Sequence, residues 1–224
     1  MLLRKGRSTV ALRCGFAVAG ILLASAPLPA QWISFGRRKT TNTNDIGSVA
    51  SDYDYKKSLA PYVSSPIPAI DQMLDLAKLK PGETLYDLGC GDGRILMEAA
   101  RRYHAKAVGV EISRRLAKEA TENVKARNLQ DKIRVIHGDM MQIDLAPANV
   151  VTLYLSTTAN ESLRPNLERY LRPNTRVVSY DYPIPGWHTI QIAQTEPGSS
   201  GVSHTIYLYQ IPASVTEATA SANQ

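Results

Sequence analysis

A glycine-rich turn between a short apolar strand and a helix constrains this chain more than any other feature. Residues 85–95 run from an apolar strand into three glycines at alternate positions, Gly89, Gly91 and Gly93. Glycine lacks the Cβ atom that would keep a ligand away from the backbone, and it tolerates the positive φ angles of a tight turn. The helix expected from Arg94 onward would point its free N–H groups at whatever lies over the turn. The sequence therefore predicts a site for a nucleotide-like cofactor.

The spacing of these glycines differs from that of a dinucleotide site. A dinucleotide fingerprint reads G-x-G-x-x-G, with an acidic residue about 20 positions later. Here the third glycine comes one position early, and Arg94 stands where that fingerprint has glycine. Asp87 precedes the turn, and a carboxylate there suits a positively charged ligand better than a pyrophosphate. S-adenosylmethionine (SAM) carries an amino group and a sulfonium, so we expect SAM as the cofactor; a purely structural glycine turn is the alternative.

Strand and helix patterns alternate along the chain. Strands are expected at 84–88, 107–111, 133–137, 150–155 and 176–180. Helices are expected at 70–79, 94–103, 114–127 and 160–171. This alternation predicts an α/β fold with a parallel sheet and helices on both faces. Residues 188–195 and 203–211 alternate around a Gly- and Ser-rich turn, which predicts a C-terminal antiparallel hairpin.

Acidic residues follow the predicted strands at their C-terminal ends, where open α/β sheets bind ligands. Glu111 ends the second strand, 24 residues after Asp87, and is expected to accept hydrogen bonds from ribose hydroxyls. Asp139 follows the third strand and can accept from an adenine amino group, while Met140 offers a soft surface to the ring. A surface glutamate and a simple strand-end turn are the alternatives. The cofactor-binding residues predicted here are Asp87, Gly89, Cys90, Gly91, Asp92, Gly93, Glu111, Ile112, Asp139 and Met140.

Residues 61–211 resemble the class I SAM-dependent methyltransferases. They are most similar to the lysine methyltransferases of the ATP synthase c subunit and of adenine nucleotide translocase, and to their bacterial relatives, in residues 61–66, 87–95 and 151–179. The resemblance implies a Rossmann-like fold with a mostly parallel seven-stranded sheet. It also implies that the segment 61–66 covers the cofactor and helps to form a substrate channel. Ser64-Ser65 and residues 156–159 depart from the family pattern, which leaves substrate selection open.

Methyl transfer from a sulfonium mainly requires alignment of the nucleophile and exclusion of water. A lysine nucleophile must be neutral, so a proton acceptor or an apolar channel is useful. Tyr62, Tyr154 and Asp181 are the candidates for this rim, although packed aromatics and a turn aspartate are equally good explanations. We expect a protein-lysine N-methyltransferase acting on a membrane-associated protein. The alternatives are a small-molecule or RNA methyltransferase, and an exported, non-catalytic methyltransferase-like binding protein.

The net charge of +6 says little about partners, because Arg4, Lys5, Arg7 and Arg13 contribute four of these charges. We therefore expect no nucleic-acid partner. We also expect the protein to be a monomer. The four histidines do not cluster, so no metal site is expected.

The N-terminal region has the pattern of a targeting segment. Residues 1–30 combine a basic start with a short apolar run, which predicts a signal peptide or an N-terminal membrane anchor. We expect the protein to be membrane-associated or exported; an organellar transit peptide is the alternative. Residues 31–60 are predicted to be a linker, 61–212 the methyltransferase domain and 213–224 a disordered tail.

Overall fold

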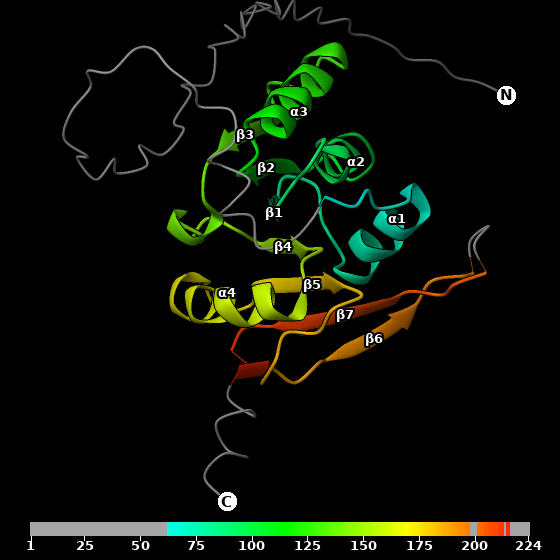
Figure 1. Ribbon diagram of the computed structural model, residues 1–224, viewed down its shortest axis with the longest axis vertical. Coiled ribbons are helices and arrows are strands. Elements are labelled where there is room, and N and C mark those ends of the chain that lie inside the picture. The colour runs from blue at the N-terminus through cyan, green and yellow to red at the C-terminus, as the bar shows by residue number, and fades with distance from the viewer. Residues whose placement is uncertain (1–61, 198–200, 213, 216–224) are drawn as a thin grey trace, which may run out of the picture. The chain divides into compact units, whose positions relative to one another are not determined.

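Seven strands form one sheet in the computed structural model, which describes residues 62–197, 201–212 and 214–215 (Figure 1). The strands are β1 (Thr84–Leu88), β2 (Lys106–Glu111), β3 (Ile133–His137), β4 (Val150–Leu153), β5 (Arg176–Tyr180), β6 (Gln191–Gln194) and β7 (Thr205–Gln210). Their order across the sheet is β3-β2-β1-β4-β5-β7-β6. Strands β1 to β5 are parallel, whereas β7 is antiparallel to both β5 and β6. The predicted α/β class, the seven-stranded sheet and the C-terminal hairpin are thereby confirmed.

Helices cover both faces of this sheet because strand side chains alternate in direction. The helices are α1 (Ile67–Leu76), α2 (Arg94–Arg102), α3 (Arg114–Ala126) and α4 (Thr157–Tyr170). Leu85 of β1 belongs to a buried cluster with Met73 of α1 and Leu96 of α2. Its neighbour Tyr86 points to the other face and joins a second cluster with Leu163 of α4. The sheet is thus the middle layer of three.

Two helices begin three residues earlier than the sequence predicts, and both shifts have a local cause. Helix α1 starts at Ile67 with Pro68 in its first turn, where proline costs nothing because its missing N–H would have no partner there. Helix α4 starts at Thr157 because Ser156 caps it, accepting at Oγ from the N–H of Ala159 at 3.2 Å.

The order in which strands are added to the sheet changes side at β1, and this change places the ligand site. From β1 the chain moves outward through β2 to β3, and it then returns to the other side of β1 to form β4 and β5. Ligands bind in α/β sheets at the carboxyl ends of the strands where the order reverses. The fourth strand ends at Leu153 rather than at residue 155, so Tyr154 and Leu155 lie in the loop beyond that end.

The expectations for 1–30 and 31–60 lie outside the described residues. Within the described part, no helix combines the length and apolarity that crossing a membrane requires. Two residues of the expected disordered tail are described, and they pack on the domain. Ser214 is buried, its carbonyl accepts from the N–H of His188 at 3.1 Å, and its Oγ accepts from the N–H of Gln210 at 3.2 Å.

Gly109 provides a test of the packing between β2 and α2. A Cβ added there would lie 2.5 Å from the Cδ1 of Leu96 in α2 and 2.6 Å from the Cys90 Sγ in the glycine turn. We expect Gly109→Ala to lower the free energy of unfolding by about 1–3 kcal/mol, as overpacking does. Gly138→Ala is the matched control, because its nearest neighbour would be Ile136 at 3.6 Å. Urea denaturation of both variants checks this, and equal midpoints would contradict it.

Candidate functional site

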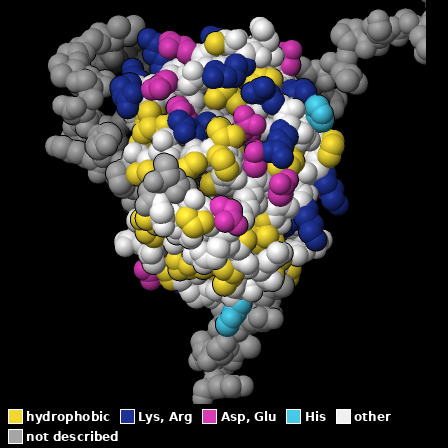
Figure 2. Space-filling model, turned by 90° about the vertical axis from the view of Figure 1, so that its right-hand side faces the viewer, with side chains coloured by type: hydrophobic (Ala, Val, Ile, Leu, Met, Phe, Trp, Pro, Cys, Tyr) yellow, Lys and Arg dark blue, Asp and Glu magenta, His cyan; other side chains and the backbone are white. Residues whose placement is uncertain are grey.

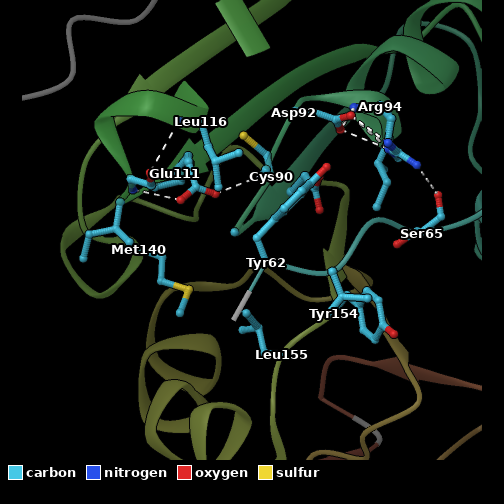
Figure 3. Close-up of a pocket in the computed structure, with 18 of the residues that line it drawn as sticks. Tyr62, Ser65, Cys90, Asp92, Arg94, Glu111, Leu116, Met140, Tyr154 and Leu155 are labelled. Atoms are coloured by element: carbon cyan, nitrogen blue, oxygen red, sulfur yellow. Dashed lines mark hydrogen bonds and ion pairs between the residues drawn. The ribbon is translucent and has the colours of Figure 1, made fainter. Parts of the chain in front are cut away.

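A pocket opens over the glycine turn, at the carboxyl ends of β1, β2 and β4 (Figure 3). The residues predicted to hold the cofactor line it, with the exception of Gly93: Asp87, Gly89, Cys90, Gly91, Asp92, Glu111, Ile112, Asp139 and Met140. Two of the three predicted rim residues, Tyr62 and Tyr154, also line it, whereas Asp181 does not. The fold therefore gathers most of the predicted site in one place.

Asp87 is the most deeply buried carboxylate of the pocket, with 3% of its surface exposed. Its Oδ1 accepts a hydrogen bond from the Thr152 hydroxyl at 2.8 Å, across the β1–β4 pair. Burial raises the pKa of Asp87 to about 7, and the nearby charges of Glu111 and Asp92 add to the rise against the Thr152 hydrogen bond. A buried carboxylate with this pKa favours a cationic ligand, because a positive charge beside it would stabilise the ionised form.

Glu111 joins the glycine turn to the end of β2. Its Oε2 accepts from the N–H of Gly91 at 2.9 Å, and its Oε1 accepts from the N–H of Ser113 at 2.8 Å. An ionised carboxylate has about four acceptor positions, so each oxygen keeps one for a further donor. Two adjacent oxygens with free acceptor positions match the paired hydroxyls of a ribose.

The loop after β3 closes the pocket beyond Glu111. Asp139 caps a short 3-10 helix, η2 (Met140–Gln142), and its Oδ1 accepts from the N–H of Met141 at 2.9 Å. Met140 and Ile112 both line the pocket and supply apolar surface there. A flat ring between these side chains would lie within reach of the Asp139 carboxylate, as an adenine requires.

Residues 62–66, before α1, form a covering segment. Tyr62 of this segment lies over the glycine turn, and Arg94 binds its Ser65. The Tyr62 ring packs so closely on Gly91 that no Cβ would fit at that position, where φ is also positive at 53°. Arg94 donates from Nη1 to the Ser65 carbonyl at 3.0 Å, and from Nε and Nη2 to Asp92 at 3.0 and 2.8 Å (Figure 3). The turn, the first residues of α2 and the covering segment are thus one connected unit.

These contacts shift the pKa of Asp92 in the opposite direction from that of Asp87. Burial alone would raise the pKa of Asp92, but the hydrogen bonds and charge of Arg94 outweigh it and hold that pKa below its usual value. Burial and the Asp92 carboxylate raise the pKa of Tyr62, which stays a neutral phenol. Asp92 lines the pocket, and both of its oxygens also bind Arg94 and so support the covering segment. Its contact with the cofactor stays a prediction.

Two residues of the glycine turn have packing roles. Gly93 is the N-cap of α2, with φ 82°. It faces Ala120 of α3, which a Cβ at Gly93 would meet at 3.2 Å, and it does not line the pocket. Cys90 lines the pocket, and burial raises the pKa of its thiol well above the ordinary value, so it remains protonated.

Asp181 lies behind Tyr154 rather than in the pocket wall. The Asp181 carboxylate is close enough that, together with burial, it raises the pKa of Tyr154 to about 12, with burial the larger cause. Sequence reasoning placed both residues at the rim, since each follows a strand. The structure separates them because the Tyr154 ring lines the pocket and its hydroxyl points away from Tyr62 (Figure 3).

Three contributing residues were not singled out by the sequence analysis. Thr152 had a recognisable signal, since it is a polar residue inside an apolar buried strand, in register with Asp87. Arg94 was noted only as a departure from the dinucleotide fingerprint, although its partner Asp92 is two positions away. Its contact with Ser65 and the pairing of His204 with Asp181 join distant segments and had no sequence signal.

Comparison with known proteins identifies the family. Residues 87–191 match the ANTKMT methyltransferase domain. A protein-lysine N-methyltransferase of Saccharolobus islandicus (strain REY15A) is 41% identical over 152 residues, which cover 67% of this chain and 93% of that protein. The chain belongs to the ANTKMT methyltransferase family. It is a SAM-dependent methyltransferase, which confirms the predicted enzyme class and cofactor.

Two further relatives show how far the likeness extends. The crystal structure of an RNA methyltransferase from Salinibacter ruber, in complex with S-adenosyl-L-homocysteine, is 40% identical with a TM-score of 0.63. It covers 67% of this chain and 94% of that one. The mouse adenine nucleotide translocase lysine N-methyltransferase is 26% identical over 132 residues, and this chain spans 57% of its length.

The pocket of this family member fits SAM on the geometry of its own residues. Asp87 would meet the amino group, Glu111 the ribose and Asp139 the adenine, each at the end of its strand. Over Gly91 the Tyr62 ring takes the space that a side chain of the turn would need, and both residues line the pocket. Within the described residues, no group of three or more His, Cys, Asp or Glu side chains is placed to hold a metal ion.

The raised pKa of Asp87 predicts a pH dependence of SAM binding. A cationic amino group prefers ionised Asp87, so SAM binding should lower the pKa of Asp87 from about 7 and release a proton. Affinity should therefore fall about tenfold per pH unit below pH 7, where the SAM amine stays protonated. Calorimetric titration between pH 5.5 and 8 measures this. Asp87→Asn should bind weakly with little pH dependence, and a flat wild-type profile would contradict the assignment.

Arg94 should hold the covering segment through the shape of its side chain as well as its charge. Arg94→Lys keeps the charge but loses the planar set of donors that reaches both Asp92 and Ser65. We expect SAM affinity to fall about tenfold, the effect of losing one or two charge-assisted hydrogen bonds. Arg101→Lys on the same helix is the control, because Arg101 is exposed and only pairs with Glu98 at 3.8 Å. Equal affinities of the two variants would refute this role.

Proposed function

We propose that this methyltransferase is a protein-lysine N-methyltransferase. The observation that carries the proposal is the 41% identity to a protein-lysine N-methyltransferase over 93% of that relative's length. Relatives named for methylation of lysine in adenine nucleotide translocase and in the ATP synthase c subunit point the same way, at 26% and 24% identity.

The chemistry of the pocket supports an amine acceptor. Bound SAM supplies a methyl group on a positively charged sulfur, ready for direct displacement by a neutral amine. Tyr62, Tyr154 and Leu155 form a largely apolar wall that excludes water and favours the neutral form of a lysine. Asp87 and Glu111 would orient the donor from below, so the protein mainly contributes alignment.

RNA methylation is the second candidate, because the 40% identical Salinibacter ruber protein is described as an RNA methyltransferase. Nucleic-acid sites carry clustered basic residues. On the face of the molecule in Figure 2, Lys and Arg side chains lie among Asp and Glu side chains, without a continuous basic surface. That face therefore gives no support for RNA as the acceptor.

We also propose that the acceptor is a membrane-associated protein and that the N-terminal segment keeps the enzyme at the membrane. The basic and apolar pattern of residues 1–30 supports this location. The relatives named for adenine nucleotide translocase and for the ATP synthase c subunit support a membrane protein as the acceptor.

One labelling experiment tests these proposals. The full-length protein is incubated with tritium-labelled SAM and, separately, with RNA, membrane protein and soluble protein from cells that lack it. We expect label in membrane protein, recovered as methyllysine after acid hydrolysis, and none with Asp87→Asn. Label confined to RNA would replace lysine methylation by the second candidate. Methyllysine in soluble protein alone would leave the lysine proposal standing but overturn the membrane acceptor.

A further inference from the structure

A cluster of aromatic side chains continues outward from the pocket wall at Tyr154. The Tyr154 ring packs edge-on against Tyr180, with centroids 4.7 Å apart, and lies nearly parallel to the Tyr182 ring at 6.4 Å. Tyr180 in turn stacks on the imidazole of His204 at 5.2 Å. Tyr154 lies in the loop after β4, Tyr180 ends β5, Tyr182 lies in the turn after it and His204 precedes β7, so the sheet order brings the four rings together.

One carboxylate, that of Asp181, lies within this cluster. Its Oδ2 is 2.7 Å from Nδ1 of His204, and its Oδ1 accepts from the N–H of Thr205 at 3.3 Å. The side chains of Asp181 and His204 are 21% and 32% exposed, so a charged group can reach the carboxylate from solvent. Within the described residues, the titratable groups that interact with Asp181 are His204, Tyr154 and Tyr180.

The backbone around Asp181 is held in an uncommon conformation. Its φ is 63°, in the left-handed region that aspartate tolerates better than most residues. Asn160 donates from Nδ2 to the carbonyls of Tyr182 at 2.9 Å and Pro183 at 3.3 Å, and the Ser179 hydroxyl also donates to the Tyr182 carbonyl. Backbone held in such sparsely populated regions is concentrated at functional sites. The turn therefore fixes where the carboxylate lies.

We propose that Asp181 binds the ammonium group of the substrate lysine beside Tyr154, and that His204 positions the carboxylate for it. This inference rests on the proposed lysine methyltransferase function. A cation is attracted by a carboxylate and by the faces of tyrosine rings, and the exposed Tyr182 adds a second ring to Tyr154. His204 acts through Asp181, so it is a positioning residue.

The subsite and the pocket wall would then act in sequence along the path of the lysine. The charged form of the side chain is favoured near Asp181, at the partly exposed turn after β5. The ammonium releases its proton to water at this partly exposed turn. Further in, the apolar surface of Leu155 and the ring of Tyr154 favour the neutral amine, which is the nucleophile. Selection of an amine thus occurs before the acceptor reaches the methyl group.

Asp181→Asn tests the subsite, because asparagine keeps the shape and the tolerance of positive φ while removing the charge. The acceptor is the protein fraction that the wild type methylates, and initial rates give the apparent KM for it. We expect the apparent KM to rise about tenfold, with kcat changed less than about twofold, as loss of one partly exposed charge contact predicts. SAM affinity by calorimetry should be unchanged. The exposed Asp131→Asn is the matched control.

Two substitutions of His204 separate positioning from packing. His204→Phe keeps a ring to stack on Tyr180 but removes the hydrogen bond to Asp181, and it should raise the apparent KM severalfold. His204→Asn places an amide near the position of Nδ1 and should restore much of the wild-type KM. A purely structural role would give the opposite order, because phenylalanine preserves the packing better.

The outcomes distinguish this inference from the function on which it rests. A wild type that transfers no methyl group to lysine overturns both. A wild type that methylates lysine, with an unchanged KM in Asp181→Asn, overturns the subsite alone. If Asp181→Asn no longer binds SAM, the KM of His204→Phe decides, and an unchanged value there overturns the inference.

Discussion

The site depends on the close packing of the Gly91 backbone between the Glu111 carboxylate and the Tyr62 ring. Beneath the turn, the N–H groups of Gly89 and Cys90 donate to the carbonyl of Val110, at 2.8 and 3.1 Å, and that of Gly91 donates to Glu111. Above it lies the ring of Tyr62. A side chain at position 91 would push the Tyr62 ring away from the turn, so the cover over the pocket depends on glycine there.

Carboxylates around this turn have different chemistry because their surroundings differ. Asp87 is buried against Thr152, and its pKa rises to about 7. Asp92 has both oxygens on Arg94, and its pKa falls. The first is suited to a cationic ligand, whereas the second holds the covering segment. One short stretch of sequence thereby serves both the cofactor and the closure of its site.

The proposed acceptor side of the site lies on different elements from the predicted cofactor side. The predicted cofactor contacts come from the ends of β1, β2 and β3, at one edge of the sheet. The aromatic cluster with Asp181 comes from the loops after β4 and β5 and from the hairpin. Such a division would allow the substrate to change while the methyl donor stays the same, and relatives are named for protein and for RNA methylation.

The sequence by itself determined the fold class, the glycine turn and the acids at the strand ends, because these depend on local periodicity and spacing. Tertiary structure alone decided the contacts between distant segments. Thr152 reaches Asp87 only through the register of β1 with β4. The pairing of Asp181 with His204 requires β7 to lie beside β5, and the same arrangement leaves Asp181 behind the pocket wall. Spacing along a chain carries no information about such neighbours, since they are chosen by strand order and packing.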